Sequence, residues 1–152
     1  MEIRRFKKAD APEVSQLIKE CYLKLDIGGH TERGRKMQIW GNNEEDLIKR
    51  SVNINYFVAV ENNKIIGICG YDKEQVHTWF VDINFHSCGI GKALLQKLLS
   101  EARAEGLKSI TTWSTFYAEK FYLAFGFDRV KEIYLPEGYK DIILFEMIKH
   151  FN

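Results

Sequence analysis

Two glycines one residue apart, Gly89 and Gly91, separate a strand-like segment from a helix-like one. Residues 79–85 are aromatic and β-branched, which predicts a strand. From residue 90 the apolar residues follow a helical period, and Gly106 is a typical C-terminal stop. The first amide groups of a helix lack internal partners and carry partial positive charge, and Lys92 adds a full charge beside them. The turn therefore favours an anion such as a phosphate, although a purely structural turn remains the alternative.

Two common nucleotide-binding motifs do not fit this turn. A dinucleotide fingerprint needs a third glycine where Leu94 stands. A P-loop needs glycine at His86 and serine or threonine at Ala93. A nucleotide-binding protein is therefore disfavoured.

The run His86-Ser-Cys-Gly-Ile-Gly91 resembles the acetyl-CoA signature of the GNAT N-acetyltransferases, Gln/Arg-x-x-Gly-x-Gly/Ala. His86 stands where that family has Gln or Arg. About thirty residues later, residues 118–127 resemble the second signature of the family, Ala-x-x-Phe-Tyr-x-x-x-Gly-Phe. The two signatures occur in the family's order, and the resemblance covers nearly the whole chain, most weakly residues 26–53.

The resemblance implies an α/β (α+β) chain with the GNAT acyl-CoA N-acyltransferase fold, in which about four helices flank a mixed sheet of about seven strands. The periodicity predicts strands at 3–6, 54–60, 64–71, 76–85, 109–113, 129–135 and 139–148. It predicts helices that begin at Asp10, Asn43, Ile90 and near Thr115. Parallel pairing is expected across the two later helices, and the two strand pairs with short turns should be antiparallel.

The resemblance also implies a set of groups that hold acetyl-CoA. Backbone groups of Val81, Asp82 and Ile83 would pair with the pantetheine arm, and an N–H near Val81 would polarise the thioester carbonyl. Thr115 stands where many members have an asparagine that positions the cofactor. The diphosphate would lie on the turn, whose residues are His86, Ser87, Cys88, Gly89, Ile90, Gly91 and Lys92.

For catalysis, Tyr122 matches the tyrosine that many members use as a general acid toward the leaving thiolate. The alternative for Tyr122 is a core aromatic residue. Asp82 is the preferred general base, while His77 and Glu74 are alternatives, and an amine bound near its own pKa needs no dedicated base. Each of these three residues also reads as an ordinary exposed polar position.

The two departures from the signature have chemical consequences. A neutral His86 still offers one donor to a phosphate, and its protonation would favour the anion. Cys88 at a helix start beside His86 is a candidate for a reactive thiol, and a filler of the turn is the alternative role.

The acceptor site is expected in residues 26–42, which have no clear period and read as a long loop. Tyr22 and Trp40 are the candidate substrate contacts, with Arg33 or Arg35 beside them. A surface loop with one anchoring tryptophan is the alternative.

Length and composition set the remaining bounds. A chain of 152 residues is expected to form a single domain over residues 1–152. Its 22 basic and 21 acidic residues argue against a nucleic-acid or anionic-membrane footprint. The N-terminal residues lack the apolar core of a signal peptide, so a cytoplasmic location is expected. The three dispersed cysteines form no metal-ligand pattern, and no metal is expected. Homodimers are common in the resembled family, although no segment here marks an interface.

Two functional hypotheses follow. The first is an acetyltransferase that moves the acetyl group of acetyl-CoA to a primary amine of a small molecule or peptide, by direct attack in a ternary complex. The second is a catalytically weak or inactive CoA-binding or regulatory module with the same fold. Tyr122 favours the first hypothesis, and the departures at His86 and Thr115 leave the second open.

Overall fold

The computed structural model describes residues 1–152 as seven strands and five α-helices. The strands are β1 (Glu2–Arg5), β2 (Asn55–Glu61), β3 (Lys64–Tyr71), β4 (Gln75–Val81), β5 (Ser109–Ser114), β6 (Asp128–Leu135) and β7 (Ile142–His150). The α-helices are α1 (Ala11–Lys24), α2 (Glu32–Trp40), α3 (Glu44–Arg50), α4 (Ile90–Ala104) and α5 (Glu119–Ala124). Short 3-10 turns, η1 (Lys8–Asp10) and η2 (Ile83–Phe85), precede α1 and follow β4. No helix combines the length and the apolar character that crossing a bilayer requires.

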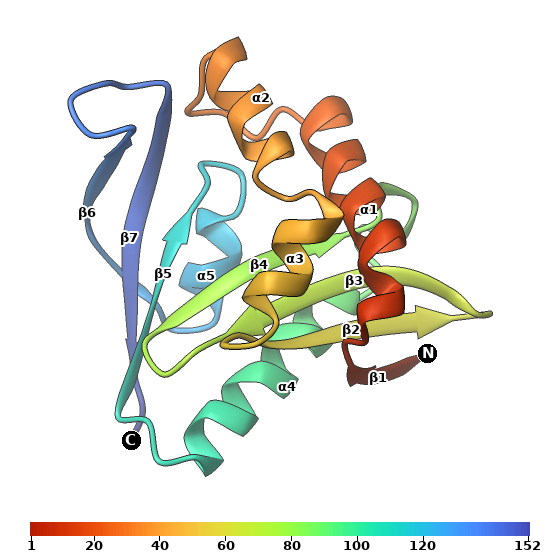
Figure 1. The fold of residues 1–152 in the computed structure, drawn as a ribbon. Helices are drawn as coiled ribbons and strands as arrows, with labels where there is room; N and C mark the ends of the chain where they lie inside the picture. The colour runs from red at the N-terminus through yellow and green to blue at the C-terminus, as the bar shows by residue number, and fades with distance from the viewer.

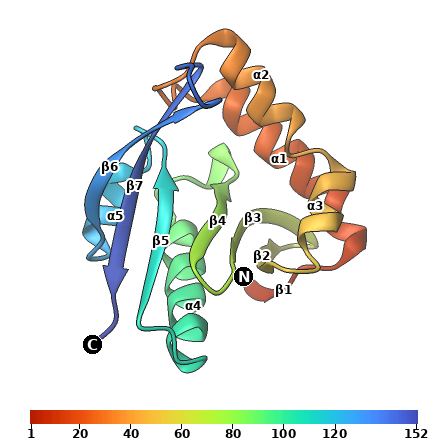
Figure 2. The ribbon, with the colours of Figure 1, turned by 60° about the vertical axis from the view of Figure 1, so that its left-hand side comes forward.

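All seven strands form one sheet in the order β1-β2-β3-β4-β5-β7-β6. Only β4 and β5 pair in parallel, and the other neighbours are antiparallel. The helices α1, α2 and α3 lie on one face of the sheet, and α4 and α5 lie on the other (Figures 1 and 2). The predicted mixed α/β architecture is therefore confirmed.

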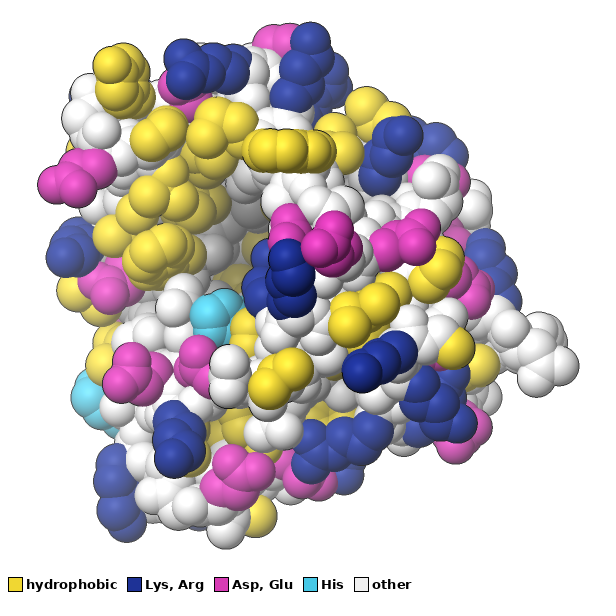
Figure 3. All heavy atoms as spheres, viewed as in Figure 1, with side chains coloured by type: hydrophobic (Ala, Val, Ile, Leu, Met, Phe, Trp, Pro, Cys, Tyr) yellow, Lys and Arg dark blue, Asp and Glu magenta, His cyan; other side chains and the backbone are white.

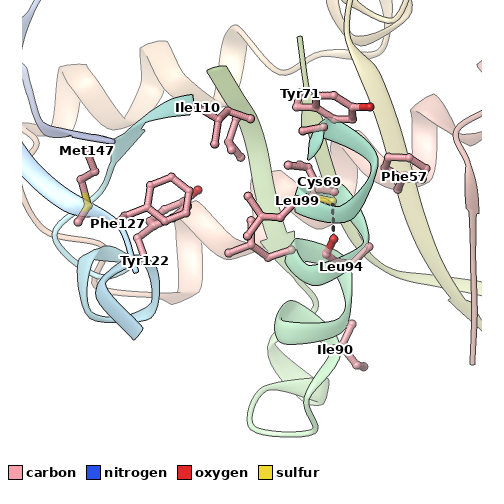
Figure 4. Close-up of a cluster of buried hydrophobic side chains, with 14 of the residues drawn as sticks. Phe57, Cys69, Tyr71, Ile90, Leu94, Leu99, Ile110, Tyr122, Phe127 and Met147 are labelled. Atoms are coloured by element: carbon pink, nitrogen blue, oxygen red, sulfur yellow. Dashed lines mark hydrogen bonds between the residues drawn. The ribbon is translucent and has the colours of Figure 1, made fainter. Parts of the chain in front are cut away.

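Each face of the sheet has its own apolar core. The buried positions of α4, among them Leu94, Leu95 and Leu98, follow the helical period and pack against the sheet on the α4–α5 face. Figure 4 shows this cluster between α4 and α5. A second cluster joins α1 and α3 to the other face through residues such as Ile18 and Leu47. These two cores fix the orientation of β4, whose alternate side chains enter one core or the other.

The structure corrects the prediction for residues 26–42, which contain the helix α2 rather than a long loop. The Thr31 hydroxyl caps this helix by accepting a hydrogen bond from the Gly34 amide at 3.0 Å. Gly34 is the only buried residue of α2, so the helix has no apolar stripe to reveal it in the sequence.

A second correction concerns the strand that follows α5. Parallel pairing was expected between β5 and β6, but β7 lies between them and pairs antiparallel with both. The β6–β7 hairpin thus inserts its second strand beside β5, and the parallel neighbour of β5 is β4 alone.

The connection between α1 and α2 forms backbone hydrogen bonds with the segments that precede α5 and β7. The Tyr117 amide donates to the Ile27 carbonyl at 3.0 Å, and the Thr31 amide donates to the Asp141 carbonyl at 2.8 Å. Between these bonds, Gly29 has a φ of +66°, and a Cβ there would lie 2.6 Å from the Ile143 carbonyl oxygen. Only glycine permits this backbone approach.

The N-terminus of α1 is also held differently from the prediction. The Asp10 carboxylate does not cap α1. It accepts from the two terminal guanidinium nitrogens of Arg4, Nη1 and Nη2, at 2.8 and 2.9 Å, and from the Lys7 amide at 2.7 Å. Burial raises the pKa of the Asp10 carboxyl, but the Arg4 and Lys7 hydrogen bonds outweigh it and leave the pKa lowered.

We predict that Asp10→Asn lowers the free energy of unfolding by about 2 kcal/mol at pH 7, because charge-assisted hydrogen bonds to a buried carboxylate are lost. A lowered folded-state pKa stabilises the fold above the unfolded pKa of about 3.9 and ceases to do so as the pH falls through the folded value. The difference from the wild type should therefore shrink below about pH 4. Urea unfolding at pH 7 and pH 3 measures both values. Asp128→Asn, at an exposed position, is the matched control, and an equal loss at the two pH values would contradict the assignment.

Candidate active site between β4 and β5

The central feature of the site is the early separation of β4 from β5. The two strands pair only at Gln75–Thr111 and Val76–Thr112. On the other edge of β4, the register with β3 shifts so that Thr78 is left without a partner. Thr78 has a φ of +52°, which a β-branched residue adopts only under strain. This bulge bends β4 away from β5, and Figure 2 shows the two strands diverging.

Side chains from the sheet and from the helices on both of its faces surround the resulting gap and form a cleft of about 490 Å³. On the face viewed in Figure 3, a hollow with a hydrophobic wall is visible on the β6–β7 side of the molecule. Of the residues predicted from the sequence, eleven line this cleft: Tyr22, His77, Val81, His86, Ser87, Gly89, Ile90, Gly91, Lys92, Thr115 and Tyr122. Four do not line it: Trp40, Asp82, Ile83 and Cys88. The alternative candidates Glu74, Arg33 and Arg35 do not line it either.

The turn before α4 presents a row of free amide groups to one end of the cleft. The amides of residues 87–92 have no hydrogen-bond acceptor within the protein. Gly89 holds the turn in the left-handed region, with a φ of +80° and open space where a Cβ would lie. A Cβ at Gly91 would make only ordinary contacts with Trp79 and Val81, at 3.4 and 3.5 Å, so protein packing does not demand glycine there. Free amides, the helix start and the unpaired Lys92 suit a diphosphate.

The end of β4 offers one further donor. The Asp82 amide donates to the Ile66 carbonyl of β3 at 2.9 Å. Since hydrogen-bonding direction alternates along an antiparallel strand, the Val81 amide points to the opposite side, toward the gap left by β5. The Val81 amide is therefore available to a ligand in the cleft, and the Asp82 amide is not.

The His86 imidazole forms hydrogen bonds with protein groups outside the turn. Its Nε2 lies 2.9 Å from the Val81 carbonyl oxygen, and its Nδ1 lies 3.2 Å from the Tyr117 hydroxyl. A carbonyl only accepts, so Nε2 carries the proton, and neutral Nδ1 accepts from Tyr117. Cys21 Sγ also contacts the Val81 carbonyl, at 3.3 Å. The imidazole thus fixes the end of β4, which differs from the expected donation to a phosphate.

Tyr122 reaches the cleft from α5 as a buried residue that is 4% exposed. Its ring packs edge-on against Trp79 and Phe127, with centroids 4.8 and 5.1 Å apart. Burial raises the pKa of Tyr122 above its ordinary value, and a hydrogen bond with Thr112 opposes this only in part. The phenol therefore stays protonated at neutral pH. Figure 4 shows its hydroxyl directed away from α5.

Asp82 lies outside the cleft. Its carboxylate binds Lys64 Nζ at 2.8 Å and accepts from the Asn84 amide at 2.9 Å, where it caps η2. Burial raises the pKa of Asp82, but Lys64 and Asn84 outweigh burial and leave the pKa lowered. A paired carboxylate with a lowered pKa, turned away from the cleft, is a poor general base.

Of the remaining predicted residues, Thr115 and Tyr22 line the cleft, and Cys88 and Trp40 do not. Thr115 accepts from the Ala118 amide at 3.1 Å and so shapes the chain before α5. Cys88 is exposed, and its thiol contacts the His86 carbonyl and not the imidazole, which provides no thiol–imidazole pair. Trp40 is 80% exposed beside Arg33, Lys36 and Met37 in a separate shallow depression. Tyr22 is buried against Phe80, with ring centroids 5.3 Å apart.

Three cleft residues carried little or no sequence signal. Tyr117 and Trp113 occur in a segment that reads only as strand and helix start, and their approach to the cleft depends on the splayed sheet. His77 was one of several polar candidates. In the structure it lines the cleft with Nε2 2.8 Å from Asp72 Oδ2. The neighbouring Asp72, four residues before Val76 in the turn, was the signal that could have distinguished it.

Comparisons with known proteins agree with this geometry. Residues 41–149 match the family model of the acetyltransferase (GNAT) domain. An uncharacterized N-acetyltransferase of Methanocaldococcus jannaschii is 34% identical over 80 residues, which make up 51% of this chain and 35% of that protein. The chain thus aligns with about a third of the length of that relative.

Solved structures show the same fold at low sequence identity. A GCN5-related N-acetyltransferase structure from Rhodopseudomonas palustris superimposes with a TM-score of 0.90 at 14% identity, over 99% of this chain and 95% of that one. The PaiA N-acetyltransferase of Thermoplasma acidophilum, in complex with coenzyme A, superimposes with a TM-score of 0.80 at 19% identity, over 99% and 98% of the two chains. With the family model matching most of its length, the chain belongs to the GNAT family of N-acetyltransferases.

Proposed function

We propose that residues 1–152 act as one catalytic domain that transfers the acetyl group of acetyl-CoA to a primary amine bound in the same cleft. The observation that carries the proposal is the row of unpartnered amides at residues 87–92, at the end of a strand that has lost its neighbour. The coenzyme A bound to the related PaiA structure supports the same assignment.

The residues present fit acetyl-CoA, which would supply an activated acetyl thioester. The turn amides and Lys92 would bind the diphosphate. The Val81 amide would pair with the extended arm or donate to the thioester oxygen. Because Asp82 and Ile83 do not face the cleft, their part would be limited to holding the end of β4.

Tyr122 would act as the general acid. Its side chain is among those that line the cleft, and the phenol holds its proton at neutral pH, so it would be ready to donate to a departing thiolate. A weak or inactive CoA-binding module is the alternative, and retention of a buried, cleft-facing phenol argues for catalysis.

We predict that Tyr122→Phe lowers kcat by about 10- to 100-fold and leaves acetyl-CoA affinity nearly unchanged, because the phenol acts on the leaving group and not on the diphosphate. Thiol release with an amine acceptor gives kcat, and calorimetry gives the dissociation constant. Tyr139→Phe, at an exposed position outside the cleft, is the control. An undiminished kcat in Tyr122→Phe would remove the acid role.

We predict opposite effects of Gly91→Glu on binding and on folding. A carboxylate in the first turn of α4 should compete with the diphosphate and weaken acetyl-CoA binding by more than about tenfold, while its interaction with the helix start maintains or raises thermal stability. Calorimetry and thermal unfolding measure the two effects.

Gln96→Glu adds the same charge to an exposed position of α4 and should change neither value by much. If Gly91→Glu binds acetyl-CoA as tightly as the wild type, the turn is a structural one and the proposed function fails.

A further inference from the structure

The cleft extends to the face of the sheet that is covered by α1 and α2. Trp79 contacts α4 and α5, through its bond to the Gly91 carbonyl and its packing on Tyr122. Phe80, the next residue, packs on Tyr22 of α1, so it belongs to the opposite face. Trp113 lies three residues after Ile110, which belongs to the core under α4, and therefore also faces α1 and α2. We name this the acceptor chamber and define it by Tyr22, Leu25, Ile27, Phe80, Trp113 and Leu144, all of which line the cleft.

The chamber is aromatic and aliphatic and contains no acid. Among the 29 residues that line the whole cleft there is no aspartate and no glutamate. The only lysine or arginine among them is Lys92, in the turn that faces the opposite end. An amine with several ammonium groups would lose water there without gaining a carboxylate partner, which is strongly unfavourable.

Two carboxylates near the chamber, Glu146 and Asp141, have cationic neighbours. Glu146 is the cross-strand partner of Trp113, and its Oε2 lies 3.9 Å from Lys131 Nζ. Asp141 accepts from the Thr31 hydroxyl at 2.8 Å and lies 4.0 Å from Arg33. Neither carboxylate is among the residues that line the cleft.

Three polar side chains line this part of the cleft: Gln38, whose Oε1 is buried without a hydrogen-bond partner, Gln75 and His77. His77 lies one residue from Val76, which belongs to the core under α4, and so extends to the α1–α2 face. Its Nε2 bonds to Asp72 Oδ2, while Asp72 Oδ1 is fixed by the Glu74 and Gln75 amides at 2.8 Å. With the proton on Nε2, Nδ1 has no partner in the protein and can accept one hydrogen bond from one amine.

We propose that the acceptor is a small primary amine with a single positive charge on an apolar, preferably aromatic, body, and that polycationic amines are poor acceptors. This inference rests on the proposed function and specifies its substrate class. Burial of an aromatic body in the chamber favours such an amine over a bare alkylamine by about 10- to 100-fold in kcat/KM.

The test uses the full chain with acetyl-CoA and four amines: phenethylamine, ethylamine, spermidine and an aminoglycoside. Thiol release gives kcat/KM, and calorimetry measures amine binding to the CoA-loaded protein. Phenethylamine should exceed each of the others by at least about tenfold in both measurements. Equal values for ethylamine and phenethylamine, higher values for spermidine or the aminoglycoside, or no binding of phenethylamine would each overturn the proposal.

A carboxylate placed in the chamber should shift the preference. Trp113→Glu, at a position that is 43% exposed, should lower the phenethylamine-to-spermidine ratio by at least about tenfold, and Leu144→Asp should act in the same direction. Val52→Asp, at a position that is 79% exposed and outside the cleft, should leave the ratio unchanged. An unchanged ratio in folded Trp113→Glu would overturn the proposal.

The two proposals fail in different ways. Transfer to spermidine with no transfer to phenethylamine would reject this substrate class and keep the acetyltransferase. Absence of acetyl-CoA binding would reject the proposed function itself.

Discussion

The loss of pairing between β4 and β5 after two residue pairs is the constraint on which the rest of the site depends. A continuous parallel pair would fill the gap with backbone hydrogen bonds and leave no cleft. The strained Thr78 and its bulge divert β4, and the free edge of the strand then needs other partners. The protein supplies some of them, since His86 and Cys21 both bind the Val81 carbonyl. The Val81 amide and the amides of the following turn are left for a ligand.

Charge is distributed unevenly within this opening. Free amides and Lys92 lie at the α4 end, while the opposite chamber is built from aromatic and aliphatic side chains with one oriented imidazole. The two ends therefore suit an anionic and an apolar compound, as the proposed transfer from acetyl-CoA to an apolar amine would use. Tyr122 is buried in the core on the α4–α5 face, where burial raises the pKa of its phenol further above neutral pH.

How far the sequence predicts this arrangement depends on how local each feature is. The strand, the glycine turn and the start of α4 are contiguous, and their residue types alone predict free amides at 88–92, to which the structure adds the amide of Ser87. The second motif predicts Tyr122 on a helix. By contrast, His86 takes its partners from β4 and from Tyr117, thirty-one residues away, so its type suggested a phosphate contact that the fold redirects. Asp82 lies on the expected strand, yet its pairing with Lys64 follows from the β3–β4 register and has no local pattern. The helix α2 escaped prediction because it buries little, and the insertion of β7 beside β5 follows from sheet closure that no periodicity encodes.

The bonds between the α1–α2 connection and the far strands have a mechanical consequence. The helix α1 packs on β3 and β4, whereas Ile27 and Thr31 bond to Tyr117 and Asp141 on the other side of the opening. One short stretch of chain thus spans the two diverging halves of the sheet and limits how far they separate. About five residues therefore limit the width of the opening, and Gly29 is the residue whose backbone lies closest to β7. Variation in the length of this stretch would change the width of the opening without altering the turn before α4.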